Sequence, residues 1–433
     1  MVQRLNTNSA DFEAAFSALL NAKRETSSDV SDIVRTIISD VAKRGDDAVI
    51  ELTHKFDRFD AATKGLAITA AEIDAACAKI DHETMKALEV AASRIHAFHE
   101  KQLPQDIDYV DDVGVRLGQN WKAVEAAGLY VPGGTASYPS SVLMNAIPAA
   151  VAGVERLVMV VPTPDDILNP LVLAAAKLAG VTEIYRIGGA QAVAALSYGT
   201  ETIAPVDKIV GPGNAFVAEA KRQVFGKVGI DSIAGPSEIL VVADNKNDPR
   251  WIAADLLSQA EHDTAAQSIL ITDSAKYGEM VIQAVEDHLA NLDRKDIALE
   301  SWSNYGAVII VNDLSDSIDL IDRLAPEHLE LAVDNPSILQ EKIRNAGAIF
   351  LGRHTPEAIG DYVAGPNHVL PTARTARFSG GLSVYDFMKR TTFVGCTEES
   401  LRAIGPAAIR LANEEGLGAH ALSVAIRLED GQN

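Results

Sequence analysis

Residues 258–263 have the sequence SQAEHD and place a glutamine and a histidine three residues apart near the end of a predicted helix. On a helix, Gln259 and His262 share one face, while Glu261 points elsewhere. The zinc helix HExxH instead has two histidines four residues apart and a glutamate base. Isolated residues of these types are more often solvated or hydrogen-bonded than metal ligands. The segment alone therefore favours an ordinary polar helix end over a metal site.

The segment APEHLEL places Glu327 directly before His328. A carboxylate and an imidazole can both be tuned to titrate near neutrality, so the pair is suited to general acid–base chemistry. The same letters also fit the start of a helix, with Pro326 at its first position and a glutamate in its first turn. Taken alone, this segment is better explained as a helix start.

Further candidates lie in polar or glycine-rich segments. Asp361 and His368 belong to the predicted loop GDYVAGPNHVLPT, and His420 lies near the end of the chain in EEGLGAHA. Cys396 follows a β-like stretch and precedes a helix, where a thiolate would be stabilised, although packing as a small apolar residue is commoner. We expect the remaining histidines to be solvated: His54, His82, His96, His99, His288 and His354.

Three glycine-rich loops follow predicted strands. GPGNAF at 211–216 comes after DKIV and opens a helix, so its N–H groups would suit a phosphate. The dinucleotide fingerprint, however, needs a small residue where Phe216 stands. YVPGG at 130–134 and GGAQ at 188–191 are equally weak singly. Three such loops at strand ends of one sheet predict a nucleotide crevice, because ligands of open α/β sheets bind at the carboxyl ends of strands.

Strands and helices alternate through most of the chain. Residues 1–105 are predicted to be mainly helical, and a short β-like piece covers 109–122. Two series of short apolar strands separated by helices then occupy 128–235 and 236–380. This alternation predicts an α/β protein with parallel sheets. The tail, 381–433, is too small for a core of its own, so it must pack on its own chain or on a partner.

Composition limits the class of protein. The 433 residues are 47% hydrophobic and carry a net charge of −22, which disfavours a nucleic-acid surface or an anionic membrane surface. Two cysteines exclude a disulfide framework and an all-thiolate zinc site. The N-terminus has no apolar signal region, and no apolar run is long enough to span a membrane. We therefore expect a cytoplasmic enzyme.

Taken together, the motifs resemble those of the histidinol dehydrogenase family along nearly the whole chain. The resemblance rests on GLYVPGGTASYPSSVLMNAIPA, GGAQAVAALSYGT, VGPGNAFVAEAKRQVFG, IAGPSEILVVAD, DLLSQAEHD, APEHLEL, GDYVAGPNHVLPT and RFSGGLSVYDF. It implies oxidation of L-histidinol to L-histidine through an aldehyde, with two NAD⁺, one water and one Zn²⁺ per subunit.

The resemblance also implies roles for particular residues. Glu327 would activate water and His328 would act as general base. Zinc would orient the substrate, held by Gln259, His262, Asp361 and His420. Substrate contacts would come from the same four ligands and from Ser237, His328, His368 and Glu415. NAD⁺ would contact Tyr130, Gln191 and Asn214, one in each glycine-rich loop.

A domain plan follows from the same resemblance: two Rossmann-like parallel-sheet domains, a helical N-terminal segment at 1–25 and a domain-swapped tail at 381–433. The zinc and substrate domain would comprise 26–127 with 236–380, and the NAD⁺ domain 128–235. The protein would be a homodimer in which each tail completes the partner's site.

Three other functions fit parts of the sequence. A thiol-dependent NAD(P) semialdehyde dehydrogenase would use Cys396 and would not need zinc. A zinc hydrolase would use Glu261 or Glu327 as base and make no use of NAD⁺. A non-catalytic nucleotide-binding protein would have lost its acid–base pair or its ligands, whereas this chain keeps both.

Overall fold

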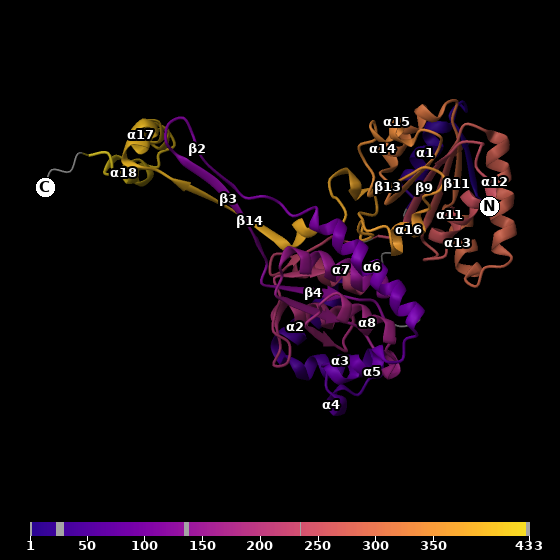
Figure 1. Ribbon diagram of the computed structural model, residues 1–433, viewed down its shortest axis with the longest axis horizontal. Helices are drawn as coiled ribbons and strands as arrows, with labels where there is room; N and C mark the ends of the chain where they lie inside the picture. The colour runs from indigo at the N-terminus through magenta and orange to yellow at the C-terminus, as the bar shows by residue number, and fades with distance from the viewer. Residues whose placement is uncertain (1, 23–29, 134–137, 234, 430–433) are drawn as a thin grey trace. The chain divides into compact units, whose positions relative to one another are not determined.

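The computed structural model describes residues 2–22, 30–133, 138–233 and 235–429 (Figure 1). The chain divides into two compact units, which are described separately. The first comprises 1–102 and 125–387, and the second comprises 103–124 and 388–433. The first unit contains two parallel sheets, of six and five strands, so the predicted α/β class is confirmed.

The five-stranded sheet is parallel throughout, with the order β6 (Glu183–Tyr185), β5 (Arg156–Val160), β4 (Ala126–Tyr130), β7 (Lys208–Val210) and β8 (Gly229–Ile230). Its connecting helices are α7 (Pro139–Ala152), α8 (Pro170–Leu178), α9 (Gly189–Tyr198) and α10 (Ala215–Val224). Prolines at the first turns of α7 and α8, and glycines after α7 and α9, set these helix boundaries. Short apolar strands buried on both faces are typical of such a sheet.

The N-terminal helices α2 (Ser31–Arg44) and α3 (Asp46–Asp57) belong to the same core as this five-stranded sheet, and both pack against its helix α9. Val34 and Val41 share one buried cluster with Val158 and Leu196. This packing differs from the expected grouping of 26–127 with 236–380. An apolar helix face reveals that the helix is buried, but not which sheet it covers. Three further helices follow: α4 (Ala61–Lys64), α5 (Ala70–Cys77) and α6 (His82–Glu100).

The six-stranded sheet is also parallel, with the order β1 (Gln3–Asn6), β11 (Ala307–Ile310), β10 (Gln267–Thr272), β9 (Glu238–Ala243), β12 (His328–Ala332) and β13 (Ala348–Leu351). Its helices are α1 (Phe12–Leu20), α11 (Pro249–Ala260), α12 (Ala275–Leu289), α13 (Lys295–Tyr305), α14 (Ser317–Leu324), α15 (Pro336–Gln340) and α16 (Glu357–Tyr362). The N-terminal segment, predicted to be helical, therefore also supplies the edge strand β1.

The last four residues of APEHLEL form the start of strand β12, so its interpretation as a helix start is wrong. Side chains along a strand alternate between the two faces of the sheet. Leu329 and Leu331 pack in a core cluster with Leu240 and Val242 of the neighbouring strand, and His328 must therefore point to the opposite face. The period of two in His-Leu-Glu-Leu is the signal that separates this strand from a helix.

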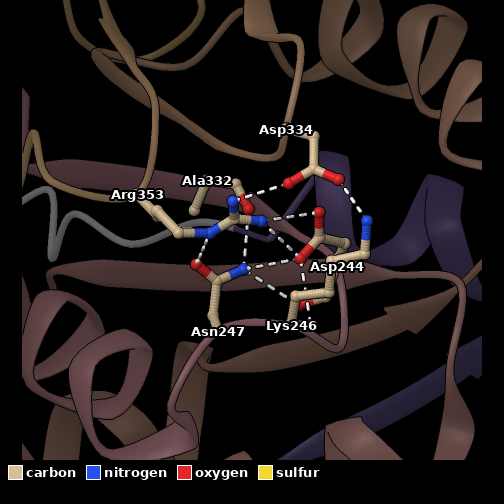
Figure 2. A network of polar contacts seen from close by, with 6 residues as sticks. All are labelled: Asp244, Lys246, Asn247, Ala332, Asp334 and Arg353. Carbon is tan, nitrogen blue, oxygen red and sulfur yellow. Dashed lines mark hydrogen bonds and ion pairs between the residues drawn. The ribbon is translucent and has the colours of Figure 1, made fainter.

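A polar network closes the carboxyl edge of this sheet where β9 and β12 end (Figure 2). Arg353, just beyond β13, donates to Asp244 after β9 at 2.9 Å and to Asp334 after β12 at 2.7 Å. Asn247 donates to the carbonyl of Ala332 at 2.7 Å. The chain order reverses between β9 and β12, which is where open α/β sheets usually bind ligands. Here the network occupies that position instead.

The second unit is an antiparallel sheet of β2 (Ile107–Val110), β3 (Arg116–Ala123) and β14 (Met388–Gly395), followed by α17 (Glu398–Glu414) and α18 (Gly418–Ala425). The tail thus pairs with a segment of its own chain. Large apolar side chains stay exposed on this unit: Val110, Val394, Leu411 and Leu422. In the part of the chain that the structure describes, no helix is long and apolar enough to cross a membrane.

Candidate active site

The predicted acid–base pair lies where β12 starts, beside the start of β9. The backbone N–H of Glu238 donates to Glu327 Oε2 at 3.0 Å, and Nδ1 of His328 lies 2.9 Å from the carbonyl oxygen of Glu238. A carbonyl only accepts, so the imidazole proton belongs on Nδ1 and the lone pair on Nε2. Nε2 is buried and has no hydrogen-bond partner among the described residues.

Burial sets the electrostatics of this pair. It lowers the pKa of His328 to about 4, so the imidazole is neutral at physiological pH and its Nε2 lone pair is available. Burial also raises the pKa of Glu327 well above its ordinary value, and the neighbouring carboxyl of Glu238 adds to that rise. An ionised Glu327 would consequently be a stronger base than an exposed carboxylate.

Gln259 and His262 meet at the end of α11, as their spacing predicts. Gln259 Nε2 lies 2.9 Å from His262 Nδ1. The glutamine side chain is fully buried, and its Oε1 has no hydrogen-bond partner within the described ranges. Burial lowers the pKa of His262, which favours the neutral imidazole that metals bind. A buried amide oxygen beside a neutral imidazole is a donor pair that suits a metal ion.

Asp361, at the end of α16, faces His368 from the loop that follows. His368 Nδ1 lies 3.4 Å from Asp361 Oδ1 and 3.1 Å from the backbone oxygen of the same residue. Burial by itself would raise the pKa of Asp361. The hydrogen bond from His368 and the nearby imidazoles outweigh it and lower that pKa to about 2. The carboxylate is therefore ionised and able to ligate a cation.

Glu357, one helical turn before Asp361, was not among the site residues predicted from the sequence. Its Oε1 lies 3.6 Å from His328 Nε2, and Ser258 Oγ donates to its Oε2 at 3.1 Å. Burial raises the pKa of Glu357 to about 8, so it is protonated near neutrality and a poor ligand. His328, Glu357 and Asp361 offer ligand atoms within 4.8 Å of one another. The sequence signal for Glu357 was its spacing from Asp361 in EAIGD, because carboxylates four residues apart share one face of a helix.

The donor set fits Zn²⁺. Gln259, His262 and Asp361 supply an amide oxygen, an imidazole nitrogen and a carboxylate, a mixed shell that a borderline cation accepts. The fourth predicted ligand, His420, lies on α18, and Glu415 follows α17; both are exposed in the second unit. Their participation stays a prediction.

A cleft of about 1030 Å³ is lined by this cluster and by two of the glycine-rich loops, 130–134 and 211–216. On one side it is lined by Ser237, Gln259, His262, Glu327, His328, Asp361 and His368, and on the other by Pro132, Gly211, Pro212, Gly213 and Asn214. The loops lie at the carboxyl ends of strands of the five-stranded sheet, as predicted. The acid–base pair instead lies at the amino ends of strands of the six-stranded sheet.

The three glycine-rich loops are tied to one another. Tyr130 Oη accepts from the backbone N–H of Gly189 at 3.0 Å. Gly211 has a φ of +113°, and a Cβ there would collide with the Tyr130 carbonyl oxygen, so only glycine fits. Tyr130 and Gln191 are buried, whereas Asn214 is exposed to the cleft. Gly134 of the first loop lies outside the described residues.

Two other expectations need correction. His99, expected to be solvated, is fully buried, and its Nδ1 lies 2.7 Å from the carbonyl oxygen of Ile95. A histidine within a polar helix gave no sign of this burial. Cys396, expected to pack as a small apolar residue, is exposed in this chain.

The glycine-rich loops of one sheet face a buried acid–base pair and a set of zinc-type ligands. This arrangement is that of an α/β enzyme of the metal-assisted dehydrogenase class. A sequence model of histidinol dehydrogenase matches residues 20–428. The chain belongs to the histidinol dehydrogenase family, which comprises NAD-dependent oxidoreductases that use Zn²⁺.

Relatives of known name are similar over their full length. The histidinol dehydrogenase of Rhodospirillum rubrum is 66% identical, with 100% of both chains covered, and that of Ruegeria pomeroyi is 64% identical, with 99% of both covered. The crystal structure of histidinol dehydrogenase from Elizabethkingia anophelis superposes with a TM-score of 0.94 at 36% identity, covering 99% of this chain and 98% of the other.

Proposed function

We propose that the chain oxidises L-histidinol to L-histidine through L-histidinaldehyde, using two NAD⁺ and one water, in the last steps of histidine biosynthesis. The observation that carries the proposal is the neutral His328, whose Nε2 is unpaired among the described residues and lies beside the Gln259, His262 and Asp361 cluster. A base poised next to metal ligands suits a substrate that carries both an imidazole and a hydroxyl group.

One Zn²⁺ per subunit would be held by Gln259, His262 and Asp361, with His420 from the tail of a second copy. When bound, the ion would fix the imidazole and amino nitrogens of the substrate and so orient its hydroxyl-bearing carbon. The Oε1 of Gln259, unpaired among the described residues, and the ionised Asp361 support this assignment. Ser237, His368 and Glu415 would complete the substrate contacts.

His328 would take the hydroxyl proton at Nε2 while a hydride leaves the same carbon for NAD⁺. The bond from Nδ1–H to the Glu238 carbonyl supports this role, because it holds the ring in the required tautomer and stabilises the imidazolium that forms. Proton transfer and hydride departure together leave an aldehyde. That aldehyde has no hydroxyl, so it must be hydrated before a second hydride can leave.

Glu327 would supply the hydration step by removing a proton from the attacking water. Its burial and its anchoring by the Glu238 N–H support the assignment, since a fixed carboxylate with a raised pKa is a competent base. His328 would then accept a second hydroxyl proton as the second hydride leaves. Histidinol, water and two NAD⁺ thus balance against histidine, two NADH and the released protons.

NAD⁺ would bind against the glycine-rich loops, with Tyr130, Gln191 and Asn214 as contacts. Asn214 lines the cleft, while Tyr130 and Gln191 are buried. The domain that carries these loops would be the Rossmann-like cofactor domain at 128–235, and 236–380 would belong to the substrate domain. The packing of α2 and α3 adds those N-terminal helices to the cofactor side.

We further propose a homodimer that exchanges tails. The exposed Val394, Leu411 and Leu422 of the second unit support it, because large apolar side chains left in contact with water favour association. A cytoplasmic location is part of the same proposal. Cys77 and Cys396 are both free thiols, which suits a reducing compartment.

The experiment that tests the function counts NADH formed per L-histidinol, with and without a chelator. Two NADH per histidinol and loss of activity on chelation are expected. One NADH per histidinol would remove the water step, and insensitivity to chelation would favour the thiol-dependent dehydrogenase. Hydrolysis of an amide without NADH formation would favour the zinc hydrolase.

A further inference from the structure

Lys221 and Asp231 form a buried ion pair in the wall of the cleft. Lys221 lies in the last turn of α10, and Asp231 directly follows β8. Their side chains are 4% and 6% exposed, and both line the cleft beside the 211–214 loop. Burying two charges is costly unless each is well paired, so the contacts of this pair matter.

Both side chains bind the backbone of Gly211. Its N–H donates to Asp231 Oδ2 at 2.8 Å, and Lys221 Nζ donates to its carbonyl oxygen at 3.0 Å. The third side is occupied by the carbonyl of Tyr130, which leaves no room for a Cβ. Gly211 is therefore fixed in its left-handed conformation by two charged side chains and a neighbouring strand.

The same contacts occupy N–H groups that a phosphate would need. Asn214 Oδ1 accepts from the N–H of Phe216 at 3.1 Å and of Val217 at 3.2 Å, which caps the start of α10. The Gly211 N–H already donates to the Asp231 carboxylate, so it cannot donate to a phosphate. The expectation from the sequence, that a phosphate could sit on this loop and helix start, is therefore not supported by the geometry.

We infer that Lys221 and Asp231 are positioning residues. They hold the 211–214 loop in one conformation before NAD⁺ binds, so that the loop offers the cofactor a surface without net charge and does not bind its phosphates. This inference rests on the proposed function, in which Asn214 contacts the cofactor. A loop ordered before binding avoids the loss of entropy that ordering it on NAD⁺ binding would cause. Loss of either charge should thus weaken NAD⁺ binding without touching the chemistry.

The test is a double-mutant cycle with Asp231→Asn and Lys221→Gln, variants that keep an acceptor and a donor and so favour folding. We expect each to raise the KM for NAD⁺ about tenfold, with kcat, the KM for histidinol and zinc content near wild type. The double variant should resemble the singles, because either change breaks the same pair. Titration with NADH, followed by its fluorescence, should show the same loss of affinity.

If the 211–214 loop bound the phosphates of NAD⁺, Asp231→Asn would change the KM for NAD⁺ in the opposite direction. Removing a carboxylate beside a pyrophosphate, or freeing Lys221 to reach it, would lower the KM for NAD⁺. A fall in KM in that variant, or an unchanged KM in both single variants, would overturn the inference.

Two control variants separate this inference from other causes of a raised KM for NAD⁺. Arg156 pairs with Glu183 in the same sheet and also donates to the Pro205 carbonyl at 2.9 Å, but it does not line the cleft. Arg156→Met should lower stability and leave the KM for NAD⁺ unchanged; an equal rise would mean that lost stability explains the effect. Asn214→Ala should raise the KM for NAD⁺. If it does not, the proposed cofactor site fails; if it does while the pair has no effect, only this inference fails.

Discussion

His328 Nδ1 lies 2.9 Å from the backbone carbonyl oxygen of Glu238, at the point where β12 and β9 begin side by side. This one contact decides which ring nitrogen is basic. Because Nδ1 must donate to the carbonyl, Nε2 carries the lone pair, and burial keeps the ring neutral. The acid–base function of the site therefore depends on the register of two parallel strands.

Replacing His328 with asparagine removes the basic nitrogen while keeping a group that can donate to Glu238. We expect kcat to fall by about 10²–10⁴-fold, the range typical of a lost general base, with folding intact. Steady-state NADH formation would measure kcat, and circular dichroism would measure folding. His288→Asn is the matched control, since that histidine also contacts a backbone carbonyl but lies outside the cleft. Activity like wild type in His328→Asn would exclude it as the base.

Replacing Glu327 with glutamine should stop the reaction after the first hydride transfer. The amide oxygen of the new side chain could still accept from the Glu238 N–H, but the amide could not take a proton from water. We expect about one NADH per histidinol and accumulation of the aldehyde, measured by trapping with a hydrazine. Glu330→Gln changes a buried glutamate of β12, three residues further along the chain, and should still give two NADH. Full stoichiometry in Glu327→Gln would assign the water step to another residue.

Replacing Gln259 with alanine removes the buried Oε1 at the proposed zinc site. We expect the protein to lose zinc on dialysis at least about tenfold faster than wild type, with its fold retained. Metal content by mass spectrometry gives a readout independent of activity. Gln267→Ala is the control, because Gln267 is also buried but contacts the Tyr305 carbonyl instead. Equal zinc retention in both variants would remove Gln259 from the ligand set.

His99 should make stability sensitive to acid. Burial lowers its pKa below the ordinary 6.5, so the unfolded chain binds a proton that the folded chain refuses. The free energy of unfolding should therefore fall as pH drops below about 6.5. His99→Asn should flatten this dependence between about pH 7.5 and 5.5 in urea unfolding, whereas His96→Asn, at an exposed position, should not. An unchanged slope in His99→Asn would contradict the assignment.

Arg353 should affect stability and not catalysis. It pairs with Asp244 and Asp334 at the edge of the six-stranded sheet opposite the acid–base pair (Figure 2). Arg353→Met leaves the largely buried Asp244 without its cation, at a cost of about 1–3 kcal/mol. Thermal unfolding should show this loss while kcat/KM stays within about twofold of wild type. A large loss of kcat/KM in a folded variant would place this network in the catalytic machinery.

The sequence alone determined the class of the fold and the residue types of the site. Alternating apolar runs and helices predicted parallel sheets, and the segments DKIV and EILVVAD became β7 and β9 because short β-branched runs suit buried strands. The three-residue spacing of Gln259 and His262 predicted their contact, since neighbours on a helix need only local geometry. Such features depend on residues close in the chain.

Only the tertiary structure decided how distant segments meet. It made APEHLEL a strand, placed Glu327 and His328 at the amino edge of its sheet, and brought Glu357 beside them. It also paired Lys221 with Asp231 around Gly211. Burial and partners of this kind depend on which elements pack together, and packing is a long-range property that local spacing does not encode. The residue types determine which reactions the site can carry out. The groups packed around these residues set their pKa values and decide which lone pairs are available.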